Sequence, residues 1–172
     1  MARKRIYAIE ENCMGCGLCE VWCVVAHSKS KDIIKAFKDE KPRPMPRIKV
    51  QNVKPTSFGL QCRFCDEPLC IAACLSGAMH YNDEGVSEHD PDKCVGCGTC
   101  ILFCPFGAIQ VDRKRGHVVA KCDMCAEEGE PACVAHCPNR ALYIEVDEDE
   151  EDEAGGKDDG SGGKPRAKKE AA

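Results

Sequence analysis

The chain has 172 residues, a formal net charge of −5 and 16 cysteines, but only 5% aromatic residues. The negative net charge argues against a nucleic-acid-binding protein, which would show a surplus of basic residues. No run approaches the roughly eighteen apolar residues of a membrane span. The N-terminal stretch MARKRIYAIEENC has neither an apolar signal core nor a twin-arginine pair, so we expect a cytoplasmic protein. With so few aromatic side chains the core must be thin, and we expect the cysteines to do structural work.

All sixteen cysteines fall into four groups of four, and each group opens with C-x₂-C and closes with C-x₃-C. This regular recurrence is an internal repeat with local insertions. In chain order, group one is Cys13, Cys16, Cys19 and Cys23; group two is Cys62, Cys65, Cys70 and Cys74; group three is Cys94, Cys97, Cys100 and Cys104; and group four is Cys122, Cys125, Cys133 and Cys137.

The segments around the groups predict short elements. A strand-like run, RIYAI, precedes group one, and residues 24–61 predict a short helix in KSKDIIKAFKDE, followed by a Pro-rich extended run. The C-x₃-C segments predict short helical turns, and LSGAMHY, PFGAIQV and PNRALYI, which follow groups two, three and four, each predict a turn and a strand. Two of these strands lead into hairpins that turn at residues 82–85 and 113–116.

Three kinds of site need many thiols: disulfides, zinc sites and iron–sulfur clusters. Disulfides are disfavoured inside the cell, where we expect this protein. Structural zinc usually takes two C-x₂-C knuckles set well apart, and one ion cannot easily bind three thiolates from a seven-residue loop. The irons of a cubane cluster are spread in space, so successive cysteines can each bind a different iron. Cys94–Pro105 matches the bacterial ferredoxin run C-x₂-C-x₂-C-x₃-C-P, and we therefore predict four [4Fe–4S] clusters.

In two-cluster ferredoxins the fourth cysteine of a group ligates the other cluster of the pair. A predicted hairpin joins groups two and three, while the runs RIYAI and ALYIEV can pair and bring groups one and four together. We therefore expect four ligand sites with exchanged fourth cysteines. Site 1 is Cys13, Cys16, Cys19 and Cys137; site 2 is Cys62, Cys65, Cys70 and Cys104; site 3 is Cys94, Cys97, Cys100 and Cys74; and site 4 is Cys122, Cys125, Cys133 and Cys23.

The expected fold class is α+β, with two modules like bacterial ferredoxins, one inserted in the other, built from short β-hairpins and short helices. Residues 1–54 and 113–146 form the outer module, which holds groups one and four. Residues 55–112 form the inserted module, which holds groups two and three. Residues 147–172 carry ten acidic and five basic side chains and nothing large and apolar, so we expect a disordered tail.

The order of the four groups resembles that of the four-cluster iron–sulfur subunits of molybdenum and tungsten oxidoreductases, such as dimethyl sulfoxide reductase and formate dehydrogenase. The length and the stretches AHSKSKDIIKAF, PRPMPRI and QCRFCDEPLC are similar to a narrower branch, the iron–sulfur subunit associated with carbon monoxide dehydrogenase and the small subunit of tungsten aldehyde oxidoreductase. This resemblance spans residues 5–146 and implies the same nested pairing. Because Cys97 is present, it also implies a four-iron rather than a three-iron cluster in group three.

Some residues near the groups have both a functional and a structural interpretation. With thiolates supplying every ligand, we expect His27 and His136 to lie at the surface or behind the ligands, and Trp22 to have a packing role. Residues 29–54 carry nine basic and three acidic side chains, which either dock a catalytic partner or form a solvated face. We expect the acidic tail to act as a solubilising segment.

The sequence predicts an electron-transfer subunit rather than an enzyme. We expect four clusters to form a wire between a catalytic metalloenzyme subunit, of the carbon monoxide dehydrogenase, aldehyde oxidoreductase or formate dehydrogenase type, and a second redox partner. No nucleophile–base pair or phosphate loop is evident, and the full ligand count argues against a catalytic cluster with an open iron. The alternative is a free polyferredoxin without a fixed partner, and self-association is left open.

Overall fold

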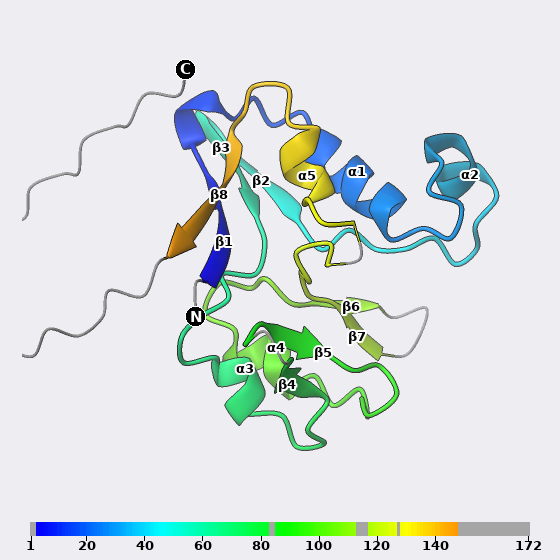
Figure 1. The fold of residues 1–172 in the computed structure, drawn as a ribbon, viewed down its shortest axis with the longest axis vertical. Helices are drawn as coiled ribbons and strands as arrows, with labels where there is room; N and C mark the ends of the chain where they lie inside the picture. The colour runs from blue at the N-terminus through cyan, green and yellow to red at the C-terminus, as the bar shows by residue number, and fades with distance from the viewer. Residues whose placement is uncertain (1–2, 83–84, 113–116, 127, 148–172) are drawn as a thin grey trace, which may run out of the picture.

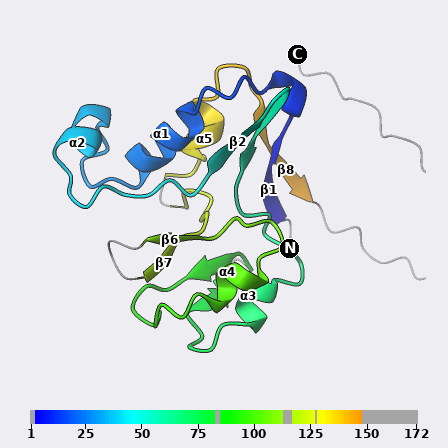
Figure 2. The ribbon, with the colours of Figure 1, turned by 180° about the vertical axis from the view of Figure 1, so that it is seen from behind.

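The computed structural model describes residues 3–82, 85–112, 117–126 and 128–147. These residues form short helices and two-stranded sheets (Figure 1). Seen from behind, residues 3–60 and 128–147, coloured blue to cyan and yellow to orange, lie in one half, and the green residues 62–104 lie in the other (Figure 2). Within the described ranges, no helix has the length and apolar character that a membrane crossing requires.

The two ends of the described chain meet in one sheet. Strand β1 (Arg3–Ala8) pairs antiparallel with β8 (Leu142–Asp147), so that Ala8 lies opposite Leu142, and the rings of Tyr7 and Tyr143 stack at 5.8 Å between centroids. This confirms the predicted pairing of RIYAI with ALYIEV. A 3₁₀ turn, η1 (Glu10–Asn12), then leads from β1 into group one.

Each C-x₃-C segment contains or adjoins a short helix, as the sequence predicts. These are α1 (Leu18–Ala26), α3 (Leu69–Ala72), α4 (Thr99–Phe103) and α5 (Ala132–Ala135). Helices α1 and α4 both begin after a glycine with positive φ, Gly17 at 74° and Gly98 at 75°, a conformation that costs glycine little. Helix α1 continues past its last cysteine, which no other group does.

The strands predicted after groups two and three are also confirmed. Strand β4 (Met79–Tyr81) pairs with β5 (Ser87–His89), and β6 (Gln110–Asp112) pairs with β7 (His117–Ala120). At the first turn, the N–H of Gly85 donates to the carbonyl oxygen of Asn82 at 3.0 Å. The predicted turn at 113–116 and the tail from 148 onward lie outside the described residues.

The segment between groups one and two holds an element that the sequence analysis missed. Helix α2 (Ile33–Lys38) forms as expected, capped by Asp32, which accepts the N–H of Lys35 at 2.9 Å. After the Pro-rich run, however, β2 (Lys49–Val53) pairs with β3 (Thr56–Leu60). This hairpin crosses the expected module boundary at 54/55, and β6–β7 crosses the one at 112/113, so the division into modules stays a prediction.

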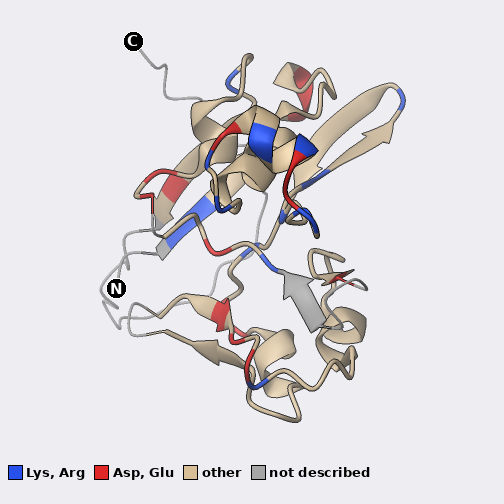
Figure 3. Cartoon of the chain, turned by 90° about the vertical axis from the view of Figure 1, so that its right-hand side faces the viewer, with Lys and Arg blue, Asp and Glu red and all other residues tan. Residues whose placement is uncertain are grey.

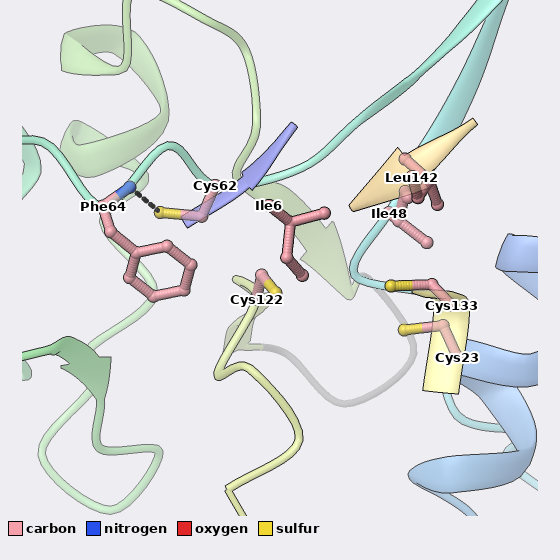
Figure 4. Close-up of a cluster of buried hydrophobic side chains, with 8 residues drawn as sticks. All are labelled: Ile6, Cys23, Ile48, Cys62, Phe64, Cys122, Cys133 and Leu142. Atoms are coloured by element: carbon pink, nitrogen blue, oxygen red, sulfur yellow. Dashed lines mark hydrogen bonds between the residues drawn. The ribbon is translucent and has the colours of Figure 1, made fainter. Parts of the chain in front are cut away.

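The core that joins these elements is half cysteine. One cluster of buried side chains combines four apolar residues with four thiols from three of the cysteine groups, and Figure 4 shows it in close-up. Its members are Ile6, Ile48, Phe64, Leu142, Cys23, Cys62, Cys122 and Cys133. A second buried cluster contains Met79, Cys100 and Ile109. These buried thiols are therefore part of the hydrophobic core.

Candidate iron–sulfur cluster sites

The four thiols of site 1 line one cavity. Cys13, Cys16, Cys19 and Cys137 all border it, whereas Cys23, the fourth cysteine of group one, does not. The β2–β3 hairpin closes the cavity with Val50 and Gly59, and the hydroxyl of Ser57 donates to the carbonyl oxygen of Cys13 at 2.7 Å. The unpredicted hairpin is therefore part of this site.

The four thiols of site 3 line a second cavity. Cys74 comes from group two, while Cys94, Cys97 and Cys100 come from group three. Helices α3 and α4 pack against each other; Cys100 lies in α4, and Cys74 follows the end of α3. Met79 and His89 of the β4–β5 hairpin complete the wall.

The thiols of site 2 lie close enough to raise one another's pKa. Burial raises the pKa of Cys65 and of Cys70, and the neighbouring thiols Cys62 and Cys104 raise both further. Cys104 is the last cysteine of group three, so a thiol of the paired group lies near Cys65 and Cys70.

Site 4 is the most buried of the four, with Cys23, Cys122, Cys125 and Cys133 all buried. Figure 4 shows Cys23 of α1 and Cys133 of α5 side by side. Burial raises the pKa of Cys133 to about 12, with further contributions from Cys23 and Cys125. Burial also raises the pKa of Cys122 well above its usual value, and Cys133 and Cys23 add to the effect.

The donor set fits iron–sulfur clusters chemically. Each site combines thiols that are close in the sequence with one from a distant group, and no other side-chain type is needed. Burial raises the pKa of Cys19 to about 12 and that of Cys100 to about 11. A metal-bound thiol must lose its proton, so these thiols would release protons on binding.

The last cysteine of each group accepts a backbone hydrogen bond. The N–H groups of Met79, Ala108 and Ala141 donate to the sulfurs of Cys74, Cys104 and Cys137 at 3.3, 3.4 and 3.2 Å. In these three groups the donor lies four or five residues after the cysteine, where the chain has turned back toward it. Group one has no such turn because α1 continues, and the N–H of Arg47 donates to Cys23 instead, at 3.1 Å.

Comparisons with known proteins point to one family. A model of the 4Fe-4S dicluster domain matches residues 53–147. An iron–sulfur protein of Rhodospirillum rubrum is 37% identical over 155 residues, which cover 81% of this chain and 80% of that one. This protein belongs to the 4Fe-4S dicluster family.

Other members support this membership. A polypeptide of the anaerobic dimethyl sulfoxide reductase of Escherichia coli K12 is 35% identical, covering 76% of this chain and 67% of its own. Electron transport protein HydN of the same organism is 33% identical, covering 80% and 85%. A solved structure, the active site complex BamBC of benzoyl coenzyme A reductase with 1,5-dienoyl-CoA, aligns with a TM-score of 0.51 over 91% of this chain and 83% of that chain. At 24% identity this is a likeness of fold alone.

In this dicluster protein, an ionic network lies behind Cys23. The His27 ring approaches the carbonyl oxygen of Cys23 at 2.7 Å through Nδ1 and the Asp123 carboxylate at 3.1 Å through Nε2, while the Arg47 guanidinium donates to the same carboxylate. Burial lowers the pKa of His27, but hydrogen bonds to Asp123 and Cys23 outweigh it and raise the pKa to about 9. The network holds the side chain of Arg47, whose backbone N–H donates to Cys23, and it places the His27 ring beside Cys23.

Trp22 and His136 pack against each other, with ring centroids 3.6 Å apart. Trp22 thus has the packing role that the sequence analysis favoured.

The basic segment 29–54 is partly neutralised by other residues of the same protein. Figure 3 shows Lys and Arg spread over the half that holds α2, and few in the half that holds α3 and α4. Lys31 pairs with Glu128 at 2.6 Å, and Arg47 pairs with Asp123. Some of the positive charges of this segment therefore form ion pairs within the protein.

Two glycines of group one give a matched test of how tightly the protein packs around site 1. Gly15 and Gly17 have φ of +68° and +74°, so alanine at either position costs about 1 kcal/mol in backbone strain. A Cβ on Gly15 would lie 3.2 Å from the Ser57 hydroxyl, whereas one on Gly17 would meet nothing within 4 Å. We expect Gly15→Ala to lower the free energy of unfolding by about 1 kcal/mol more than Gly17→Ala.

The measurement is chemical unfolding of both variants under anoxic conditions, together with their iron content. Equal losses in the two variants would show that the β2–β3 hairpin does not press on the group-one loop.

Proposed function

We propose that this iron–sulfur electron-transfer protein holds four [4Fe–4S] clusters and serves as a wire between a catalytic metalloenzyme subunit and a second redox partner. The observation that carries the proposal is the composition of the two cavities. Each is lined by three thiols of one group and the last thiol of another, which is the exchange typical of two-cluster ferredoxins. The ligands would be those of sites 1 to 4.

The residues around the thiols have three tasks. Short helices fix the spacing of the sulfurs, apolar neighbours such as Ile6 and Leu142 keep water away from the buried thiols, and backbone N–H groups donate to the last thiol of each group. When bound, such clusters supply one-electron oxidation and reduction, with potentials that depend on hydrogen bonds, burial and charge.

Exposure of the thiols supports a wire with two ends. Cys16 of site 1 and Cys97 of site 3 are exposed, whereas every thiol of site 4 is buried. A redox partner could therefore approach closely at site 1 and at site 3, but not at site 4. We propose that these two sites are where electrons enter and leave.

The partner class is proposed from the relatives and from the sequence resemblance. One relative is named as part of a dimethyl sulfoxide reductase and another as an electron transport protein. We propose a catalytic partner of the carbon monoxide dehydrogenase, aldehyde oxidoreductase or formate dehydrogenase type. The protein itself is not the catalytic subunit.

Anoxic purification of the full chain from its native source tests both parts. We expect about 16 irons and 16 sulfides per molecule, and co-purification of a large subunit that contains nickel, molybdenum or tungsten. A protein with four clusters but no stoichiometric partner would support the free polyferredoxin instead. A protein with fewer than four clusters after anoxic reconstitution would contradict the ligand assignment.

A further inference from the structure

A buried lysine directly precedes group four. Lys121 is 4% exposed, and its ammonium donates to the carbonyl oxygen of Ser87 and, at 3.4 Å, to that of Cys122. The same ammonium lies 4.8 Å from the centroid of the Phe64 ring. Lysine is rarely buried unless a partner carries the opposite charge. Among the described residues, however, no carboxylate forms an ion pair with Lys121.

The contacts of Lys121 place its charge between two of the candidate sites. In the sequence, Phe64 stands between Cys62 and Cys65, the first two thiols of site 2, and Cys122 is the first thiol of site 4. Cys62 of site 2, Phe64 and Cys122 of site 4 belong to one buried cluster, so the ammonium over the Phe64 ring lies close to both sites. Site 2 and site 4 therefore share one buried cation at the junction between the β4–β5 hairpin and the segment that precedes group four.

A fixed cation beside a redox centre favours its reduced form, because reduction adds a negative charge. The effect is large only where water is excluded, since exposed charges are screened. The thiolate-ligated clusters at sites 2 and 4 would supply the negative charge that pairs with the Lys121 ammonium. This gives a physical reason for burying a lysine there.

We propose that the buried positive charge of Lys121 raises the reduction potentials of the clusters at sites 2 and 4 relative to those at sites 1 and 3. The inference rests on the proposed four-cluster function. It assigns the clusters at sites 2 and 4 a shared electrostatic control that the clusters at sites 1 and 3 do not have.

The sequence offers a matched control. Lys93 directly precedes group three just as Lys121 directly precedes group four, but its side chain is 62% exposed and it pairs with Asp90 at 3.2 Å. Lys121→Gln removes the charge and keeps a hydrogen-bond donor, Lys121→Met removes both, and Lys121→Arg keeps both. Lys93→Gln removes an equivalent charge that solvent already screens.

The experiment is a redox titration of the full chain, loaded with clusters under anoxic conditions and followed by electron paramagnetic resonance. We expect Lys121→Gln to lower the reduced-to-oxidised ratio of two clusters roughly tenfold at a fixed potential, which is a shift of about 59 mV for a one-electron couple. The other two clusters should keep their potentials. Lys121→Arg should restore most of the shift, and Lys93→Gln should leave all four within about twofold.

Each remaining outcome decides the matter. If Lys121→Gln retains its iron and all four potentials stay unchanged, or if it behaves like Lys93→Gln, the inference is wrong. If both neutral variants lose iron while the arginine variant keeps it, Lys121 holds the fold rather than the potentials, and the inference is again wrong. A natural protein that binds fewer than four clusters would instead overturn the proposed function.

Discussion

Removal of iron from the anoxically purified protein is expected to abolish its cooperative fold. The sheets of the described residues are all two-stranded, and such hairpins are marginally stable alone. The helices are equally short, since the longest described one has nine residues. Half of the main buried cluster is thiol, so without metal the elements would have to pack around empty, sulfur-lined cavities. In such a protein the free energy of metal binding contributes directly to the stability of the fold.

The measurement is far-UV circular dichroism and thermal unfolding before and after anoxic treatment with an iron chelator and an oxidant-free desalting step. We expect the unfolding transition to disappear and most of the dichroism to be lost. Adding ferrous iron, sulfide and a thiol reductant should restore both, which separates metal loss from chemical damage. A cooperative transition in the iron-free protein would refute the idea that clusters serve as core.

Replacement of Cys23 by serine is expected to damage the cluster of group four, although Cys23 belongs to group one. Cys23 is absent from the lining of the site 1 cavity, and its sulfur raises the pKa of Cys133. Loss of the Cys23 thiol should therefore affect the cluster at site 4. The variant should lose about four of the 16 irons, and its remaining group-four thiols should become reactive.

Alkylation followed by mass spectrometry identifies which thiols have been freed. In Cys23→Ser the alkylated residues should be Cys122, Cys125 and Cys133. The converse variant, Cys137→Ser, is the control and should free Cys13, Cys16 and Cys19 instead. If Cys23→Ser frees the other thiols of group one, each group binds its own cluster and the exchange between groups is wrong.

The sequence was a good guide wherever the repeat applies. The C-x₃-C helices, the strands after groups two, three and four, and the β1–β8 pairing all follow from local patterns that recur near each group. The exchanged thiols come together because those strands and helices do. Cys137 therefore reaches the site 1 cavity although it lies more than a hundred positions from the other three thiols.

Outside the repeat, local patterns were insufficient. The β2–β3 hairpin was hidden by the proline residues before it and by a turn at Lys54 and Pro55 that has no glycine or asparagine at its centre. The donation from Arg47 to Cys23 joins residues 24 positions apart, and no spacing rule predicts it. The burial of Lys121 likewise depends on Phe64 and Ser87, which are distant in sequence.

The pairing of β1 with β8 has a consequence for how the protein is made. Strand β1 leaves the ribosome before the other described elements, but its partner β8 is complete only when residue 147 has been added. With the ligands proposed above, sites 2 and 3 are complete once Cys104 has emerged, whereas sites 1 and 4 wait for Cys137 and Cys133. Translation at about 5 to 20 residues per second separates these moments by a few seconds. The maturation machinery would therefore meet sites 2 and 3 as finished cofactor acceptors while sites 1 and 4 are still open.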